Sequence, residues 1–140
     1  MRRFLTEVLV FGIALSACSR NVGDTAPREF TGVWLYEFEG STFIEGATRI
    51  PSKRPAYMKA AWLDYHPDQQ RPGQFVELSD KDSYDERRRC YLIYPFIVTF
   101  IGRRTINPHG SGHMGLWASE VKPDRMISSK PLGRPFCYGS

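Results

Sequence analysis

Two histidines in a glycine-rich loop have the spacing of a metal-binding pair. His109 and His113 are four residues apart, a separation that places two imidazoles on one face of a helix in zinc enzymes. Three glycines interrupt the loop, and no glutamate follows His109 as the HExxH motif requires. We therefore treat the two histidines as weak metal candidates and predict no catalytic residue and no cofactor. An envelope hydrolase or metal-dependent enzyme using this loop remains the alternative function.

The serine of the same loop does not match a hydrolase nucleophile. Ser111 lies between two glycines, whereas the nucleophile elbow has glycines two residues before and two residues after the serine. Those two positions are occupied by His109 and His113. We expect a structural role for His113, as a side chain that hydrogen-bonds the backbone across a turn.

The first eighteen residues have the layout of an export signal. Two arginines at positions 2 and 3 precede an uninterrupted apolar run, Val8–Leu15, and small residues follow it. This run is too short to cross a membrane as a helix. The next pattern resembles the lipobox of bacterial lipoproteins, and its four positions are Leu15, Ser16, Ala17 and Cys18. The resemblance implies that Leu15, Ser16 and Ala17 are recognised by the processing machinery, that residues 1–17 are removed, and that Cys18 is lipidated.

The resemblance also implies a location. A lipoprotein carries palmitate or related acyl chains on its cysteine, and two or three chains hold a protein stably on a membrane. In that family an aspartate after the cysteine is the usual retention signal for the inner membrane, and this chain has Ser19 there. We therefore expect a lipid-anchored protein of the cell envelope, at the outer membrane and facing the periplasm.

The expected location also bears on the other two cysteines. Cys90 and Cys137 remain once Cys18 is assigned to lipid, and an oxidising compartment favours their pairing as one disulfide. The alternative is two separate thiols, with Cys90 buried at the start of a strand and Cys137 in a loose tail.

Composition limits the size of the fold and the kind of partner. Without residues 1–17 the chain is long enough for one domain, and we place a tether at 18–29 and a single β domain at 30–140. The net charge of +4 falls to +3, because two arginines and one glutamate leave. A mild positive charge favours an anionic cell-wall or lipid component, or another envelope protein, as the partner. Nucleic acid is not expected in an exported compartment.

One segment has a clear strand pattern. Between Gly32 and Glu39 the aromatic residues Trp34, Tyr36 and Phe38 alternate with other residues, which predicts a strand with one aromatic face. We expect this face to belong to the core; a platform for stacking sugars is the alternative. A bulge or bend is expected at positions 40–41, with the strand continuing through residues 42–44.

The remaining segments are assigned more coarsely. A strand is favoured over a short helix at Tyr57–Tyr65, and a charged, solvated loop is expected at Ser79–Arg89. The apolar run from Cys90 predicts a short arm followed by a buried strand from Phe96 to about Arg104. The other expected elements are a strand at 74–78, a loop at 107–115, a final strand at 116–117 and 120–129 with Pro123 at its edge or start, and a tail at 130–140.

These elements predict a mainly β domain. We expect a small antiparallel, partly open barrel of five or six strands, of which the OB fold is one form; the alternative is an α+β fold with one helix near 57–65. Residues 102–129 resemble the C-terminal part of small uncharacterised envelope lipoproteins that carry a Gly-His-Met/Leu-Gly loop, here Gly112 to Gly115. That resemblance implies no activity. The function expected is a non-enzymatic, membrane-tethered binding or structural module.

Overall fold

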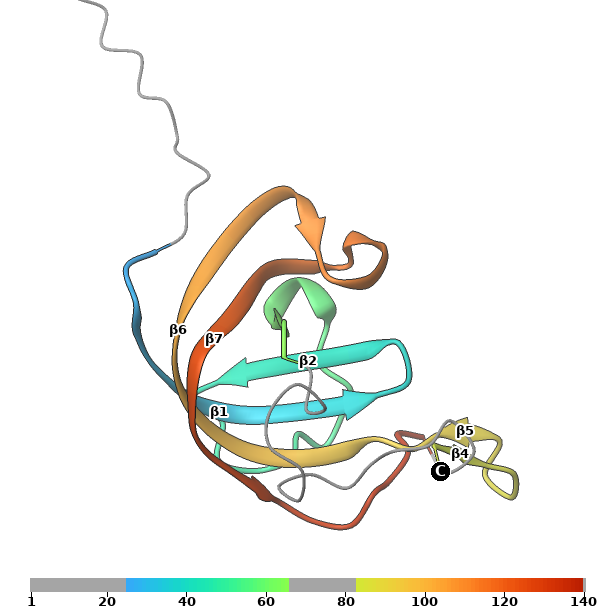
Figure 1. Ribbon diagram of the computed structural model, residues 1–140. Coiled ribbons are helices and arrows are strands. Elements are labelled where there is room, and N and C mark those ends of the chain that lie inside the picture. Colours follow the sequence, from blue (N-terminus) through green and yellow to red (C-terminus); the bar gives the residue numbers. More distant parts are fainter. Residues whose placement is uncertain (1–24, 66–82, 140) are drawn as a thin grey trace, which may run out of the picture.

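The fold is a small barrel of five strands, shown in Figure 1. A computed structural model describes residues 25–65 and 83–139. The barrel strands are β1 (Arg28–Glu37), β2 (Gly40–Glu45), β3 (Ala61–Leu63), β6 (Tyr94–Ser111) and β7 (Trp117–Pro131). The short strands β4 (Tyr84–Asp85) and β5 (Cys90–Tyr91) form a separate pair, and two single 3₁₀ turns are η1 (Tyr57–Lys59) and η3 (His113–Gly115).

The prediction of a mainly β, small barrel is confirmed. The strands close in the order β1-β2-β3-β7-β6, so that β1 pairs with both β2 and β6. If the five barrel strands are numbered in chain order without β4 and β5, their order around the barrel is 1-2-3-5-4, which is OB-like. Two details differ from the expectation: the barrel is closed, and β3 runs parallel to β7 while the other pairs are antiparallel. The predicted strand near residue 61 is present, and η1 is the only helical turn in the described part of 57–65.

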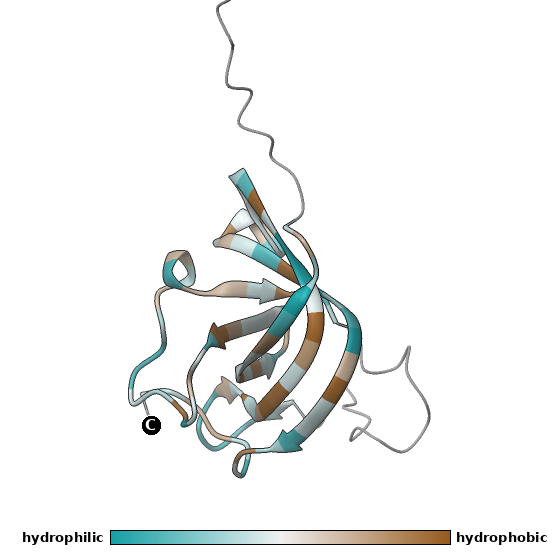
Figure 2. Cartoon of the chain, turned by 90° about the vertical axis from the view of Figure 1, so that its left-hand side faces the viewer, coloured by the Kyte–Doolittle hydropathy of each residue, from teal (hydrophilic) through white to brown (hydrophobic). Residues whose placement is uncertain are grey.

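The interior of the barrel is aromatic. Alternation along β1 places Phe30 and Trp34 inside, where Trp34 is fully buried and Tyr36 packs at the margin. Phe30 stacks on Phe100 of β6, with ring centroids 5.3 Å apart. Figure 2 shows the resulting change between apolar and polar bands along the strands. The other buried members of this cluster are Phe43, Ala61, Leu63, Tyr65, Val98 and Val121.

A second apolar cluster covers the outside of β1 and β6. Val33, Leu35 and Ile93 are buried there, under the C-terminal tail. The tail is held by a backbone bridge, since the Ile93 amide donates to the Phe136 carbonyl at 2.8 Å and the Phe136 amide donates back at 3.1 Å. Burial of both faces explains why the sequence from residue 91 to 101 is almost wholly apolar.

The first two strands meet at a tight turn that the sequence did not predict. β1 ends at Glu37, residues 38 and 39 form the turn, and β2 starts at Gly40 opposite Glu37. The expected bend within one strand at residues 40–41 is therefore wrong. Phe38 lies at the turn and is exposed, so that only Trp34 and Tyr36 of the predicted aromatic face belong to the core.

The last two barrel strands are longer than predicted. β6 continues to Ser111, through part of the expected loop at 107–115. Pro123 lies within β7, opposite Gly102 at a shift in register. A proline is tolerated at such an irregularity of the ladder, and in the described residues β3 pairs with β7 only at residues 119–121. β1 begins at Arg28, so the last residues of the expected tether belong to the fold.

Some expectations between β3 and β4 concern residues that the structure does not describe. The predicted strand at 74–78 lies outside the described residues, as does the beginning of the charged segment Ser79–Arg89. Within the described ranges, no helix has the length and apolar character needed to cross a membrane.

Candidate functional site

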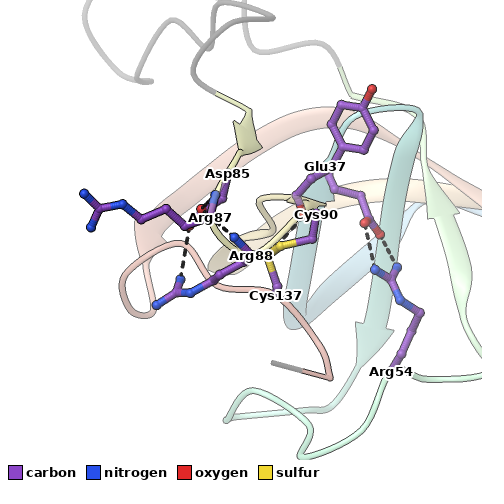
Figure 3. Close-up of a disulfide and its surroundings, with 8 residues drawn as sticks. Glu37, Arg54, Asp85, Arg87, Arg88, Cys90 and Cys137 are labelled. Atoms are coloured by element: carbon purple, nitrogen blue, oxygen red, sulfur yellow. Dashed lines mark hydrogen bonds and ion pairs between the residues drawn. A yellow bond between two sulfur atoms is a disulfide. The ribbon is translucent and has the colours of Figure 1, made fainter.

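The β4–β5 pair is held against the barrel by a disulfide. Cys90 of β5 and Cys137 of the tail are bonded, as predicted, with Cα atoms 6.4 Å apart (Figure 3). The bond fixes the loop preceding β6 to the chain end. Because Ile93 and Phe136 pair a few residues away, two independent links hold this lobe.

The turn between β4 and β5 presents three consecutive arginines. One carboxylate oxygen of Asp85 accepts hydrogen bonds from the backbone amides of Arg87 and Arg88, at 2.9 and 3.0 Å. This local arrangement is the one by which aspartate closes a turn on its own backbone. Arg89 adopts a positive φ of 55°, which completes the reversal before Cys90. The three arginine side chains are exposed, and we call this segment the arginine turn.

Among the described residues, only one of the three arginine side chains forms an ion pair. Arg88 lies 3.7 Å from the second oxygen of Asp85, with half of its side chain exposed. Among the residues that the structure describes, no carboxylate forms an ion pair with Arg87 or Arg89. A turn whose backbone is satisfied by Asp85 and whose guanidinium groups reach into solvent can bind carboxylates or phosphates in a bidentate manner.

An aromatic stack lies beside the arginine turn. The rings of Phe38, at the β1–β2 turn, and Tyr91, on β5, lie parallel with centroids 4.6 Å apart. Phe38 is 43% exposed and Tyr91 is 44% exposed. Tyr84 of β4 meets the edge of Tyr91 at 5.0 Å. We call these three residues the aromatic stack; it joins the barrel to the β4–β5 lobe and leaves two ring surfaces open to solvent.

Another arginine of this region, Arg54, is paired with a carboxylate and adds no net positive charge to the surface of the arginine turn. Arg54 forms a two-pronged pair with Glu37, in which its Nη2 lies 3.0 Å from Glu37 Oε2. This hydrogen bonding raises the pKa of the Arg54 guanidinium, so the pair stays charged. Burial raises the pKa of Tyr138, whose hydroxyl donates to the Pro51 carbonyl at 3.2 Å. The region behind the disulfide is thus structural.

His109 lies near the end of β6, and His113 lies in η3 on the β6–β7 connection. His109 is exposed near the end of β6, and its backbone amide donates to the side chain of Asn107 at 3.0 Å. The His113 side chain is also exposed and faces Glu39, with Nε2 to Oε2 at 3.8 Å, instead of bonding the backbone as expected. In the described ranges, His, Cys, Asp and Glu form no group of three that could hold a metal ion.

The lipobox residues lie outside the described part of the chain, and Phe38 and Tyr91 form a contact that the sequence did not predict. Leu15, Ser16, Ala17 and Cys18 lie outside the described residues, so the lipobox stays a prediction. The contact between Phe38 and Tyr91 could not be predicted, because the two residues are distant in sequence and the turn at residues 38–39 has no local signal. The run of arginines is visible in the sequence, where it predicts only a charged, solvated loop.

Comparisons with known proteins found no similar protein. No family model, curated protein or solved structure matches the chain.

Proposed function

We propose that this chain is a lipid-anchored envelope protein that acts as a non-enzymatic binding module. Its binding surface is the arginine turn together with the aromatic stack, and its ligand is an anionic envelope polymer that contains sugar rings. The protein is held at the outer membrane by acylated Cys18 and faces the periplasm. The lipobox pattern at 15–18 supports the anchor.

The observation that carries the binding proposal is that exposed flat rings share one lobe with exposed guanidinium groups, of which those of Arg87 and Arg89 form no ion pair among the described residues. Phe38 and Tyr91 are large residues that are nearly half exposed, whereas every other aromatic residue that the structure describes is buried or half-buried. Flat apolar surfaces of this kind suit the faces of sugar rings, and arginines suit carboxylates or phosphates. The stack is joined to the turn through β5, so both parts keep a constant spacing.

Binding to polygalacturonate, an anionic sugar polymer, tests the ligand class. Replacement of Arg87, Arg88 and Arg89 by alanine should weaken binding at least about tenfold, the equivalent of one charge-assisted hydrogen bond. The matched control replaces three exposed cations of the β6–β7 hairpin, Arg103, Lys122 and Arg125, which removes the same charge elsewhere.

The comparison separates a site from a general charge effect. Titration calorimetry at two salt concentrations should show a loss for the arginine-turn variant and little change for the control. Equal losses in the two variants would reduce the result to net charge and refute the site. The Phe38→Ala variant should also bind less tightly, while dextran, a neutral polymer, should bind more weakly than polygalacturonate to the unaltered protein.

The anchor has a test of its own. Cys18→Ser should release the protein from the membrane fraction or leave it unprocessed, since the thiol is the acceptor of the acyl chains. Fractionation and the mass of the mature N-terminal peptide measure this. Normal maturation and unchanged membrane attachment of the variant would exclude a lipid anchor at Cys18.

A further inference from the structure

Three exposed apolar side chains occur near the outer end of the β6–β7 hairpin. Ile106 on β6, Met114 in η3 and Leu116 just before β7 are 62, 81 and 41% exposed. Only four other large apolar side chains of the described residues are as exposed, and two of these belong to the aromatic stack. Three apolar side chains within eleven residues is a concentration that a water-facing loop does not need.

The hairpin end is rigid, so these side chains keep their positions. Trp117 is buried at its base, and its indole N–H donates to the Thr42 hydroxyl at 3.2 Å. Gly112 packs directly on Trp62, where an added Cβ would lie 2.5 Å from the ring. The exposed apolar groups are therefore presented by a fixed support, which lowers the entropy cost of inserting them into another phase.

The chain enters the barrel beside this end. The Thr25 amide donates to the Arg104 carbonyl at 3.0 Å, and the Arg104 amide donates to the Thr25 hydroxyl at 3.0 Å. Arg104 precedes Ile106 by two residues on β6. Six residues lie between Cys18 and Thr25, and the seven residue-to-residue steps of this stretch span at most about 25 Å in any conformation. An anchor at Cys18 therefore keeps this part of the barrel close to the membrane.

The charge of the hairpin fits the same neighbour. Between Gly102 and Arg125 the sequence holds four lysines and arginines against two acidic residues. Arg103 and Lys122 are partners across the strands, and their side chains are 44 and 71% exposed although they form ion pairs with Asp124 and Asp64. Apolar side chains flanked by cations that reach headgroup phosphates are the signature of a segment that lies at a bilayer surface.

We propose that the β6–β7 end rests on an anionic phospholipid bilayer, with Ile106, Met114 and Leu116 in the headgroup region. This inference rests on the proposed lipid anchor, which supplies the proximity. It goes beyond anchoring because it assigns an orientation to the domain. Figure 1 shows the hairpin rising at one end of the barrel and β4 and β5 at the other. In this orientation β4 and β5, which carry the arginine turn, lie farther from the membrane than the hairpin end, whereas Glu39, next to Phe38 of the aromatic stack, lies beside His113 of η3.

Fluorescence quenching in vesicles tests the orientation with a matched pair of positions. Leu116→Cys and Ile127→Cys place the label at two positions of similar exposure, 41 and 47%. Position 116 lies at the hairpin end, whereas position 127 lies farther along β7, away from that end. The full lipidated protein, labelled with a polarity-sensitive fluorophore, is reconstituted into phosphatidylethanolamine and phosphatidylglycerol vesicles with brominated acyl chains. We expect quenching at least about threefold stronger at position 116 than at 127, because interfacial side chains reach the acyl boundary.

The outcomes distinguish this inference from the anchor. Ile106→Cys, a second position in the patch, should behave as position 116 does, which guards against a local effect of one label. Equal quenching at 116 and 127, or stronger quenching at 127, overturns the proposed orientation. The mass of the N-terminal peptide is measured on the same samples: acylated Cys18 with equal quenching refutes the hairpin contact alone, whereas absent acyl chains refute the anchor and with it the basis of the orientation.

Discussion

Removal of the disulfide should destabilise the domain by an amount that the chain connectivity predicts. Cys90 and Cys137 are separated by 47 residues, and closing a loop of that length lowers the entropy of the unfolded chain by the equivalent of about 4 kcal/mol. The double variant Cys90→Ala/Cys137→Ala removes the link without leaving a free thiol. For a domain of this size the loss corresponds to a melting temperature lower by about 10 to 20 °C.

Guanidinium unfolding followed by tryptophan fluorescence measures the change. Trp34 and Trp117 are buried in different parts of the barrel, so their emission reports global unfolding. The midpoint should fall, and the dependence on denaturant should become steeper, because the unfolded chain without the link exposes more surface. Thermal unfolding by circular dichroism gives an independent value.

Reducing agent provides the control and the refutation. Dithiothreitol should destabilise the unaltered protein by a similar amount and leave the double variant unchanged. A free-energy difference below about 1 kcal/mol would refute the loop-entropy reasoning. That result would mean that the cross-linked chain is no more restricted when unfolded than the open one.

Two further changes probe the interior and the surface. Ser41→Ala should cost about 1 to 3 kcal/mol, because the buried Ser41 hydroxyl accepts from Trp34 Nε1 at 2.9 Å and donates to the Leu63 carbonyl at 2.6 Å, and both partners would be left unpaired; urea unfolding measures the loss. Glu45 accepts a hydrogen bond from Arg28 at 2.6 Å, and this bond lowers the pKa of Glu45 in the folded protein. The stabilising contribution of the Glu45 carboxylate is therefore complete above the unfolded carboxyl pKa of about 4.3, and it is lost as the pH falls through the lower pKa of the folded state. The stability difference between the unaltered protein and Glu45→Gln, at most about 1 kcal/mol for so exposed a pair, should therefore shrink below about pH 4.

Each of these two predictions has a contradicting outcome. The exposed pair of hydroxyls of Thr31 and Thr99, 3.2 Å apart, serves as control for the buried serine, since Thr31→Ala leaves groups that water can satisfy. Equal losses for Ser41→Ala and Thr31→Ala would contradict the burial argument. A difference between the unaltered protein and Glu45→Gln that stays constant from neutral pH to pH 3 would contradict a role for the Glu45 charge.

The core of the barrel could be predicted where side-chain alternation matches burial. Trp34 and Tyr36 lie two apart on β1, and the pleat of a strand turns such positions to the same side. The apolar run before and within β6 likewise marked the centre of the fold. Phe38 belonged to the same pattern and is nevertheless exposed, because the strand ends at Glu37 and a turn of Phe38 and Glu39 contains none of the residue types that usually signal reversal.

The candidate site was less predictable because it joins distant segments. The disulfide followed from a count of cysteines and an assumed compartment. The run of arginines was visible, but its presentation depends on Asp85 and on the cross-link to Cys137. The stack of Phe38 on Tyr91 requires the β1–β2 turn and β5 to meet, which local patterns do not encode.

The sequence by itself indicated the class of the fold, favoured the pairing of Cys90 with Cys137 over two separate thiols, and gave the expectation that Cys18 is an acyl acceptor, because each depends on residue type and local order. Tertiary structure decided which apolar residues remain exposed, that β3 runs parallel to β7, and that arginines and aromatic rings share one lobe. The physical reason is that burial and nonlocal pairing are properties of the packed chain: a strand's period specifies which side chains share a face, but only the neighbouring strands and the C-terminal tail decide whether that face is covered.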